Sequence, residues 1–91
     1  MAGEFLRFLA QKRLCFHCHE PMKPTPVRKK RNGDYDKGWT REHIVPKSKG
    51  GRKGDNIVLA HYKCNQERGN VDPTLEMIER AKVINAIASE I

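Results

Sequence analysis

Hydrophobic and polar positions follow two periodicities along the chain, and each predicts a different kind of element. Residues 38–45 and 56–60 are short segments with aromatic and β-branched side chains, which predict two strands. Residues 4–13 place four large apolar side chains at helical spacing and predict a short helix. A second helix is expected over residues 62–66, ending near Gly69.

The last segment predicts a longer helix over about residues 73–90. Asp72 is expected as its N-cap and Pro73 as its first helical residue, because these residue types favour those positions. Apolar residues then recur at helical spacing: Leu75, Ile78, Ala81, Ile84, Ile87 and Ile91. We interpret this stripe as a face that packs on the core, and a homodimer formed through it is the alternative.

The segment between the first helix and the first strand carries signals of turns. Three prolines argue against regular structure there: Pro21, Pro24 and Pro26. The Asn-Gly-Asp sequence at residues 32–34 is a turn signal that would close a hairpin between residues 27–28 and Tyr35. Residues 46–55 predict a glycine-rich loop between the two strands.

The size of the chain indicates that an apolar core alone does not stabilise it. At 91 residues, we expect one α+β domain over residues 1–91, near the size at which a small core needs a metal or disulfide. Three cysteines cannot all pair as disulfides, and Cys15-x2-Cys18 has the spacing of a zinc site. The sequence therefore predicts a structural Zn2+ ion and a reducing, cytoplasmic location.

The fourth zinc ligand has three candidates. His61-x2-Cys64 repeats the spacing of the first cysteine pair, so we expect four tetrahedral ligands: Cys15, Cys18, His61 and Cys64. Such a site would clamp a knuckle at residues 15–22 onto residues 61–64. His17 and His19 remain alternatives to His61, because each neighbours a cysteine of the knuckle.

Positive charge is concentrated in the middle of the chain. Residues 23–53 hold eleven Lys and Arg against three acidic residues, a net charge of +8, whereas the remainder carries −1. Such a segment attracts phosphates and favours nucleic acid as a partner, although a run such as residues 28–31 also fits a solvated loop. The candidate DNA-contacting residues are Arg28, Lys29, Lys30, Arg31, Arg41, Lys47, Lys49, Arg52 and Lys53.

The hydrophobic pattern predicts no membrane partner. The longest aliphatic stretch, residues 57–60, is far too short to cross a bilayer. Arg7 interrupts the apolar residues 5–10, so these do not make a convincing signal peptide.

The chemistry-bearing residues of the second half follow one another in a specific order. Glu42-His43-Ile44-Val45-Pro46 comes first, and Gly50-Gly51 and Asn56-Ile57-Val58-Leu59 follow. His61-x2-Cys64-Asn65 with Arg68-Gly69 completes the series. With the knuckle, this pattern resembles the HNH endonucleases of the His-Me finger group over residues 15–69. One departure is His61, which stands where that family usually has cysteine.

This resemblance implies a ββα-metal core over about residues 38–69 and a metal-dependent endonuclease that hydrolyses DNA, expected to be double-stranded. Products would carry 5′-phosphate and 3′-hydroxyl ends. The cell would be bacterial or phage-infected. The resemblance also implies that Asn56 does no chemistry itself but ties the loop to the strand and so holds His43 in place.

Hydrolysis of a phosphodiester needs an activated water and a cation. His43 is the expected general base, because the unperturbed pKa of histidine, about 6.5, leaves it neutral near pH 7.5. Glu42 and Asn65 offer oxygen ligands to a divalent cation, expected to be Mg2+, or Mn2+ or Ni2+ in vitro. Arg68, one helical turn after Asn65, is a further candidate for phosphate contact.

A regular pleat would send Glu42 and His43 to opposite faces of their strand, so their convergence requires the strand to end or twist before Pro46.

Two alternatives to the endonuclease interpretation remain open. The first is a non-catalytic zinc module that binds nucleic acid. A domain that acts only with a phage or host protein, as an accessory subunit of a phage packaging machine, is the third interpretation.

Overall fold

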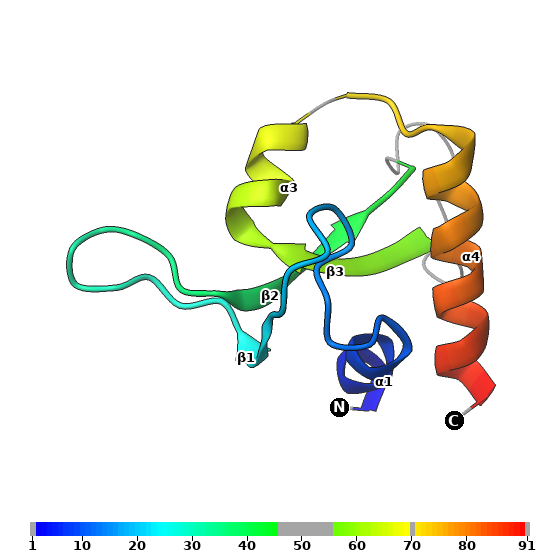
Figure 1. Ribbon diagram of the computed structural model, residues 1–91, viewed down its shortest axis with the longest axis horizontal. Coiled ribbons are helices and arrows are strands. Elements are labelled where there is room, and N and C mark those ends of the chain that lie inside the picture. Colours follow the sequence, from blue (N-terminus) through cyan, green and yellow to red (C-terminus); the bar gives the residue numbers. More distant parts are fainter. Residues whose placement is uncertain (1, 46–55, 70, 91) are drawn as a thin grey trace.

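The computed structural model describes residues 2–45, 56–69 and 71–90. It has the small α+β fold expected from the sequence, with a three-stranded sheet and helices (Figure 1). None of the described helices is long and apolar enough to cross a membrane. The elements in chain order are α1 (Ala2–Ala10), β1 (Lys23–Pro26), β2 (Gly38–His43), β3 (Ile57–His61), α3 (Tyr62–Arg68) and α4 (Leu75–Glu90).

The sheet has the strand order β1-β2-β3. β2 and β3 are antiparallel, with Glu42 opposite Val58 and His43 opposite Ile57. β2 ends at His43, two residues earlier than predicted, and α3 begins directly after β3. The two strands and the short helix therefore adopt the ββα arrangement expected of residues 38–69.

The prediction of no regular structure around the prolines was wrong, because Lys23–Pro26 pairs with β2 as a parallel edge strand. Proline is tolerated there, since an edge strand needs its N–H groups on one side only. Gly38 allows the close approach of the two strands. A Cβ at this position would lie 2.6 Å from the carbonyl oxygen of Thr25.

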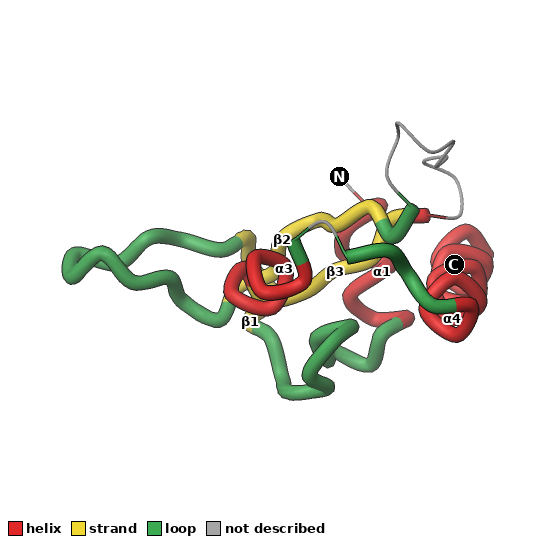
Figure 2. The backbone as a smooth tube through the Cα atoms, turned by 90° about the horizontal axis from the view of Figure 1, so that it is seen from above, coloured by secondary structure: helices red, strands yellow, loops and turns green. Residues whose placement is uncertain are grey.

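The predicted hairpin is present in the connection from β1 to β2, around the turn at residues 30–33. Lys29 and Tyr35 form a bridge, and the backbone N–H of Gly33 donates to the carbonyl of Lys30 across the turn. The hairpin extends away from the sheet, and α4 lies at the opposite end of the molecule (Figure 1 and Figure 2). The basic residues of the hairpin are therefore displayed on a projection.

The outer edge of β3 is covered by polar groups of other segments. Gln11 accepts from the N–H of Leu59 and donates to its carbonyl, both at 2.8 Å, and the N–H of Phe16 donates to the same carbonyl. The Asn85 amide donates to the carbonyl of Ile57 at 2.8 Å. These contacts satisfy backbone groups that an open edge strand would leave unpaired.

Buried side chains form two clusters that both include residues of β3, and all four residues 57–60 are buried, which explains why they are apolar without alternation. One cluster joins α1 and the knuckle: Phe8, Cys15, Met22, Leu59 and Ala60. The other joins the knuckle and α4: Phe16, Ile44, Val58, Ala81 and Ile84. The first helix therefore packs on the knuckle.

Both terminal helices differ from their predicted bounds. α1 ends at Ala10, because Lys12 and Arg13 adopt left-handed backbone conformations with φ of 56° and 66°. The prediction of Asp72 as N-cap was wrong. α4 begins at Leu75, and the Thr74 hydroxyl accepts from the N–H of Met77 at 3.1 Å, as an N-cap does.

The packing face of α4 is only part of the predicted stripe. Ala81 and Ile84 are buried, whereas Leu75 is 81% and Ile87 41% exposed. Asn85 is a buried polar residue on the packing face, and its amide donates to the carbonyl of Ile57 at the edge of β3. Dimerisation through this helix stays a prediction, and Ile91 lies outside the described residues.

Candidate functional site

The knuckle and the start of α3 bring four sulfur and nitrogen ligands together. The ligand atoms of Cys15, Cys18, His61 and Cys64 all lie within 4.8 Å of one another. The Nδ1 atom of His61 lies 3.3 Å from Cys18 Sγ and 4.0 Å from Cys64 Sγ. Neighbouring ligands of a tetrahedral zinc ion are about 3.5–3.8 Å apart. The cluster could therefore hold a structural zinc ion, as predicted.

The orientation of His61 fits this role. Its Nε2 atom lies 3.1 Å from the carbonyl oxygen of Pro21, so Nε2 carries the proton and donates there. This contact leaves the lone pair of Nδ1 directed at the cysteines, which is the usual arrangement of a zinc-binding imidazole. Of the two alternatives, His17 contacts Glu42 instead, and His19 is exposed.

Burial raises the pKa of the Cys64 thiol to about 12, with further contributions from the charge of Cys15 and a hydrogen bond with Cys18. With so high a pKa, the Cys64 thiol keeps its proton near neutral pH when no cation is bound. Zinc would displace that proton, since a coordinated thiol is deprotonated by the ion.

Glu42 occupies the centre of a second polar group. Its carboxylate is 4% exposed, and Nη1 of Arg68 donates to Oε2 at 2.6 Å. The same guanidinium donates to the carbonyl oxygens of His43 at 3.3 Å and Ile44 at 2.6 Å. Arg68 therefore connects α3 to the Glu42 side chain and to the backbone at the end of β2.

The knuckle supplies the other partner of Glu42. The Nε2 atom of His17 lies 2.8 Å from both carboxylate oxygens, Oε1 and Oε2. The sequence offered His17 as a zinc ligand and missed this contact. The sequence did show a histidine between the two knuckle cysteines. Spacing alone could not decide whether it belongs to the zinc cluster or to the polar group around Glu42.

Asn56 is buried beside the end of β2. Its Oδ1 atom accepts from the N–H of Val45 and its Nδ2 atom donates to the carbonyl of the same residue, both at 2.7 Å. The side chain thus holds the backbone directly after His43 and Ile44. A role of Asn56 in catalysis stays a prediction.

The remaining predicted site residues are spread over different elements. His43 is half-buried at the end of β2, and Asn65 is half-buried on α3. Arg68 contacts Glu42 and two backbone carbonyls inside the protein and its side chain is 10% exposed, so its contact with DNA stays a prediction. Gly50, Gly51 and the basic residues of the loop lie outside the described residues: Lys47, Lys49, Arg52 and Lys53.

The hairpin carries four exposed basic residues, Arg28, Lys29, Lys30 and Arg31. Two contacts attach the hairpin to α3. The rings of Tyr35 and Tyr62 stack with centroids 4.0 Å apart, and Lys63 Nζ lies 2.9 Å from an oxygen of Asp34. Arg41 is also exposed and contacts Glu4 at 3.2 Å. The projection is thus fixed to the helix that carries Asn65.

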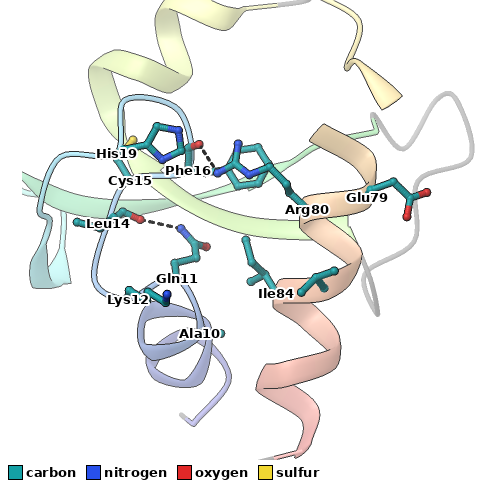
Figure 3. Close-up of a pocket in the computed structure, with 11 residues that line it drawn as sticks. Ala10, Gln11, Lys12, Leu14, Cys15, Phe16, His19, Glu79, Arg80 and Ile84 are labelled. Atoms are coloured by element: carbon teal, nitrogen blue, oxygen red, sulfur yellow. Dashed lines mark hydrogen bonds between the residues drawn. The ribbon is translucent and has the colours of Figure 1, made fainter. Parts of the chain in front are cut away.

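A cavity of about 470 Å³ lies between α1, the knuckle and α4 (Figure 3). Arg80 of α4 donates to the carbonyl of Phe16 at 3.0 Å and lies over its ring at 4.2 Å. None of the predicted catalytic residues lines this cavity. The contacts of Arg80 in this cavity instead hold Phe16, the knuckle residue that precedes His17.

The comparisons with known proteins give one match. Residues 28–71 match the family model described as HNH endonuclease. No curated protein and no solved structure gave a significant match. The matched segment contains Glu42, His43, Asn56, Asn65 and Arg68 in the order of the sequence pattern. This part of the chain belongs to the HNH endonuclease family, whose substrate is nucleic acid.

Proposed function

We propose that this domain is a DNA endonuclease that hydrolyses phosphodiester bonds and depends on a divalent cation. One observation carries the proposal. Arg68 links the buried Glu42 carboxylate to the carbonyls of His43 and Ile44, so motif residues from β2 and α3 meet at one place. Family membership over residues 28–71 supports phosphodiester hydrolysis as the reaction.

In this proposal, His43 is the general base that takes a proton from the attacking water. A neutral imidazole is suited to that step near neutral pH. Two anchors fix the backbone on which His43 stands, the Arg68 bond to its carbonyl and the Asn56 bonds to Val45. Backbone fixed at His43 itself and at Val45 would restrict the imidazole to few positions and so favour a productive geometry.

The catalytic cation would be held by Glu42 and Asn65. A carboxylate and an amide oxygen are ligands that Mg2+ and Mn2+ accept. Glu42 is deeply buried, and its two oxygens have about four lone-pair sites for the two groups that contact them, Arg68 and His17, so the residues present fit such an ion. When bound, the ion would supply positive charge for the phosphoryl oxygens and lower the pKa of bound water.

The zinc ion would have a separate, structural role in this proposal. Its ligands come from the knuckle and from the junction of β3 and α3. A bound ion would therefore clamp the knuckle onto the helix that carries Asn65 and Arg68. Thiolates favour zinc and oxygen ligands favour magnesium-like ions, so the two metals need not compete.

Double-stranded DNA is the proposed substrate. The exposed basic residues of the hairpin would contact phosphates, together with Arg41. Attachment of the hairpin to α3 through Tyr35 and Tyr62 would keep these contacts at a constant distance from the catalytic residues. Contacts of this kind position the duplex without reading its sequence.

One observation favours a second candidate, a zinc module that binds nucleic acid without cutting it. Both Glu42 oxygens already lie against donors, His17 and Arg68. If these contacts persisted in solution with a divalent cation present, the carboxylate would serve the fold alone. The two candidates differ in whether cleavage depends on a cation.

The test is incubation of the purified, zinc-loaded protein with supercoiled plasmid in Mg2+, Mn2+ or Ni2+. The proposed function predicts open-circle or linear products with each active ion and none after a mild chelator. Retarded plasmid without cleavage in any of the three ions would favour the binding module instead.

A further inference from the structure

The contact between His17 and Glu42 joins the zinc knuckle to the proposed catalytic centre. We propose that His17 is an additional ligand of the catalytic divalent cation, so that a nitrogen atom from the knuckle completes the oxygen ligands of Glu42 and Asn65. This inference rests on the proposed function for the role of Glu42. It concerns a residue outside the segment that matches the family model, which begins at residue 28.

The distance between the two side chains fits shared coordination. His17 Nε2 lies 2.8 Å from each oxygen of Glu42. Adjacent ligand atoms of an octahedral ion, each at about 2.0–2.1 Å, lie about 3 Å apart. The side chains therefore need only a small separation to become neighbouring ligands.

Space for a hydrated ion is available beside His17, in a cavity that neither Glu42 nor Asn65 lines. A cavity of about 360 Å³ is lined by His17 and Arg68 together with Cys18, Cys64 and Glu67. The His17 side chain is 20% exposed, so solvent reaches the imidazole although Glu42 is buried. Ions such as Mg2+ and Mn2+ keep several waters when bound, and an open side is what they require.

His17 is held firmly enough to act as a ligand. The flanking cysteines, Cys15 and Cys18, both belong to the zinc cluster. Phe16 is 1% exposed, its backbone N–H donates to Leu59, and its carbonyl accepts from Arg80 (Figure 3). A short segment fixed at Cys15, Phe16 and Cys18 restricts the orientation of the imidazole, which reduces the entropy lost on metal binding.

The charges at the site explain why a neutral nitrogen ligand would matter. Arg68 offsets the charge of Glu42 at 2.6 Å, so the pair attracts a cation less than a lone carboxylate would. An imidazole adds a strong ligand without adding charge. Nitrogen ligands favour Mn2+, Co2+ and Ni2+ over Mg2+, so His17 would shift the preference of the site toward these ions.

The alternative is that His17 acts only as a hydrogen-bond donor that positions Glu42. The variant His17→Gln separates the two, since its amide can still donate to the carboxylate but offers no nitrogen lone pair. His19→Asn is the matched control. His19 lies in the same knuckle, is exposed, and has a left-handed backbone with φ of 62° that asparagine tolerates.

The experiment is electron spin echo spectroscopy of Mn2+ bound to the zinc-loaded protein without DNA. The wild type should show nitrogen modulation from a directly bound imidazole, and His19→Asn and His43→Ala should keep it. His17→Gln should lose it, and its Mn2+ dissociation constant should rise at least about tenfold. Labelling histidine with 15N should replace the 14N pattern, which identifies the imidazole without any substitution.

Nitrogen modulation that persists in His17→Gln, or a 14N pattern that persists in the wild type labelled with 15N-histidine, would overturn the ligand role and leave the proposed nuclease function standing. Modulation lost in His43→Ala instead would assign the nitrogen to His43 and overturn the role of His17. If the wild type neither binds Mn2+ nor cleaves plasmid with it, the inference and the proposed function fall together.

Discussion

Arg68 and Glu42 form a largely buried ion pair in which Nη1 lies 2.6 Å from Oε2, with the side chains 10% and 4% exposed. The two residues are 26 positions apart, and the pair joins α3 to β2. Two further bonds from Arg68 reach the carbonyls of His43 and Ile44. One guanidinium thus fixes the candidate metal ligand and the backbone of the candidate base.

Replacing Arg68 by methionine should therefore destabilise the domain strongly. The variant would leave a buried carboxylate with His17 as its remaining partner and remove the donor to two carbonyls. Loss of one partner of a buried pair typically costs about 3–5 kcal/mol. Chemical denaturation measures the change. Arg41→Met is the control, because the exposed Arg41–Glu4 pair should contribute no more than about 1 kcal/mol. Equal effects of the two substitutions would contradict the importance of the buried pair.

Zinc content should separate the four cluster residues from the other knuckle histidines. The purified protein should carry about one zinc ion per chain, as a Cys3His site does. Cys18→Ser, Cys64→Ser and His61→Ala should each lose zinc and cooperative thermal unfolding, since the core is small. His17→Gln and His19→Asn should keep the metal. Zinc lost from His19→Asn but kept by His61→Ala would move the fourth ligand into the knuckle.

The base of the hairpin should resist acid to an unusually low pH. Backbone N–H groups of Arg28 and Gly38 donate to Asp36 and hold its pKa below the usual 3.8. A depressed pKa in the folded state contributes stability above the unfolded pKa, and this is lost as pH falls through the folded value. Amide NMR shifts of Arg28 and Gly38 should therefore titrate below pH 3.8. A midpoint at or above that value, or an unchanged titration in Asp36→Asn, would contradict this account.

DNA binding should depend strongly on salt through the hairpin. Each phosphate neutralised contributes about −0.9 to the slope of log K against log salt concentration. Replacing Lys29, Lys30 and Arg31 together by glutamine should make that slope shallower by up to about 2.7. A triple variant of Lys12, Arg13 and Lys82 removes the same charge elsewhere and should leave the slope unchanged. If the hairpin variant also keeps the wild-type slope, the contacts belong to the loop residues Lys47, Lys49, Arg52 and Lys53.

The main elements were predictable because periodicity and turn signals act locally. The apolar segment at residues 57–60 predicted a strand, and the structure shows it buried on both sides. β1 was missed because its pairing depends on Gly38, which lies far along the chain and admits close backbone contact. The start of α4 was misplaced because two residues, Asp72 and Thr74, both suit an N-cap, and it is the Thr74 hydroxyl that accepts from the N–H of Met77.

The zinc cluster was predictable because metal ligands repeat at fixed short spacing. The partners of Glu42 were not, since His17 lies 25 positions and Arg68 26 positions away in sequence. Arg68 was expected to contact a phosphate because it lies one helical turn after Asn65. Only the folded chain shows that the carboxylate and two carbonyls at the end of β2 provide enough acceptors for a largely buried guanidinium.

The cleavage activity of His43→Ala tests the central claim most directly. His43 stands at the end of β2, and its removal spares the zinc cluster, the Arg68–Glu42 pair and the hairpin. The account predicts that this variant keeps its zinc, thermal stability and affinity for duplex DNA but no longer converts supercoiled plasmid to open-circle or linear forms with Mg2+ or Mn2+. Removal of a general base typically lowers the rate about 10²–10⁴-fold. Cleavage by His43→Ala at the wild-type rate would contradict the account.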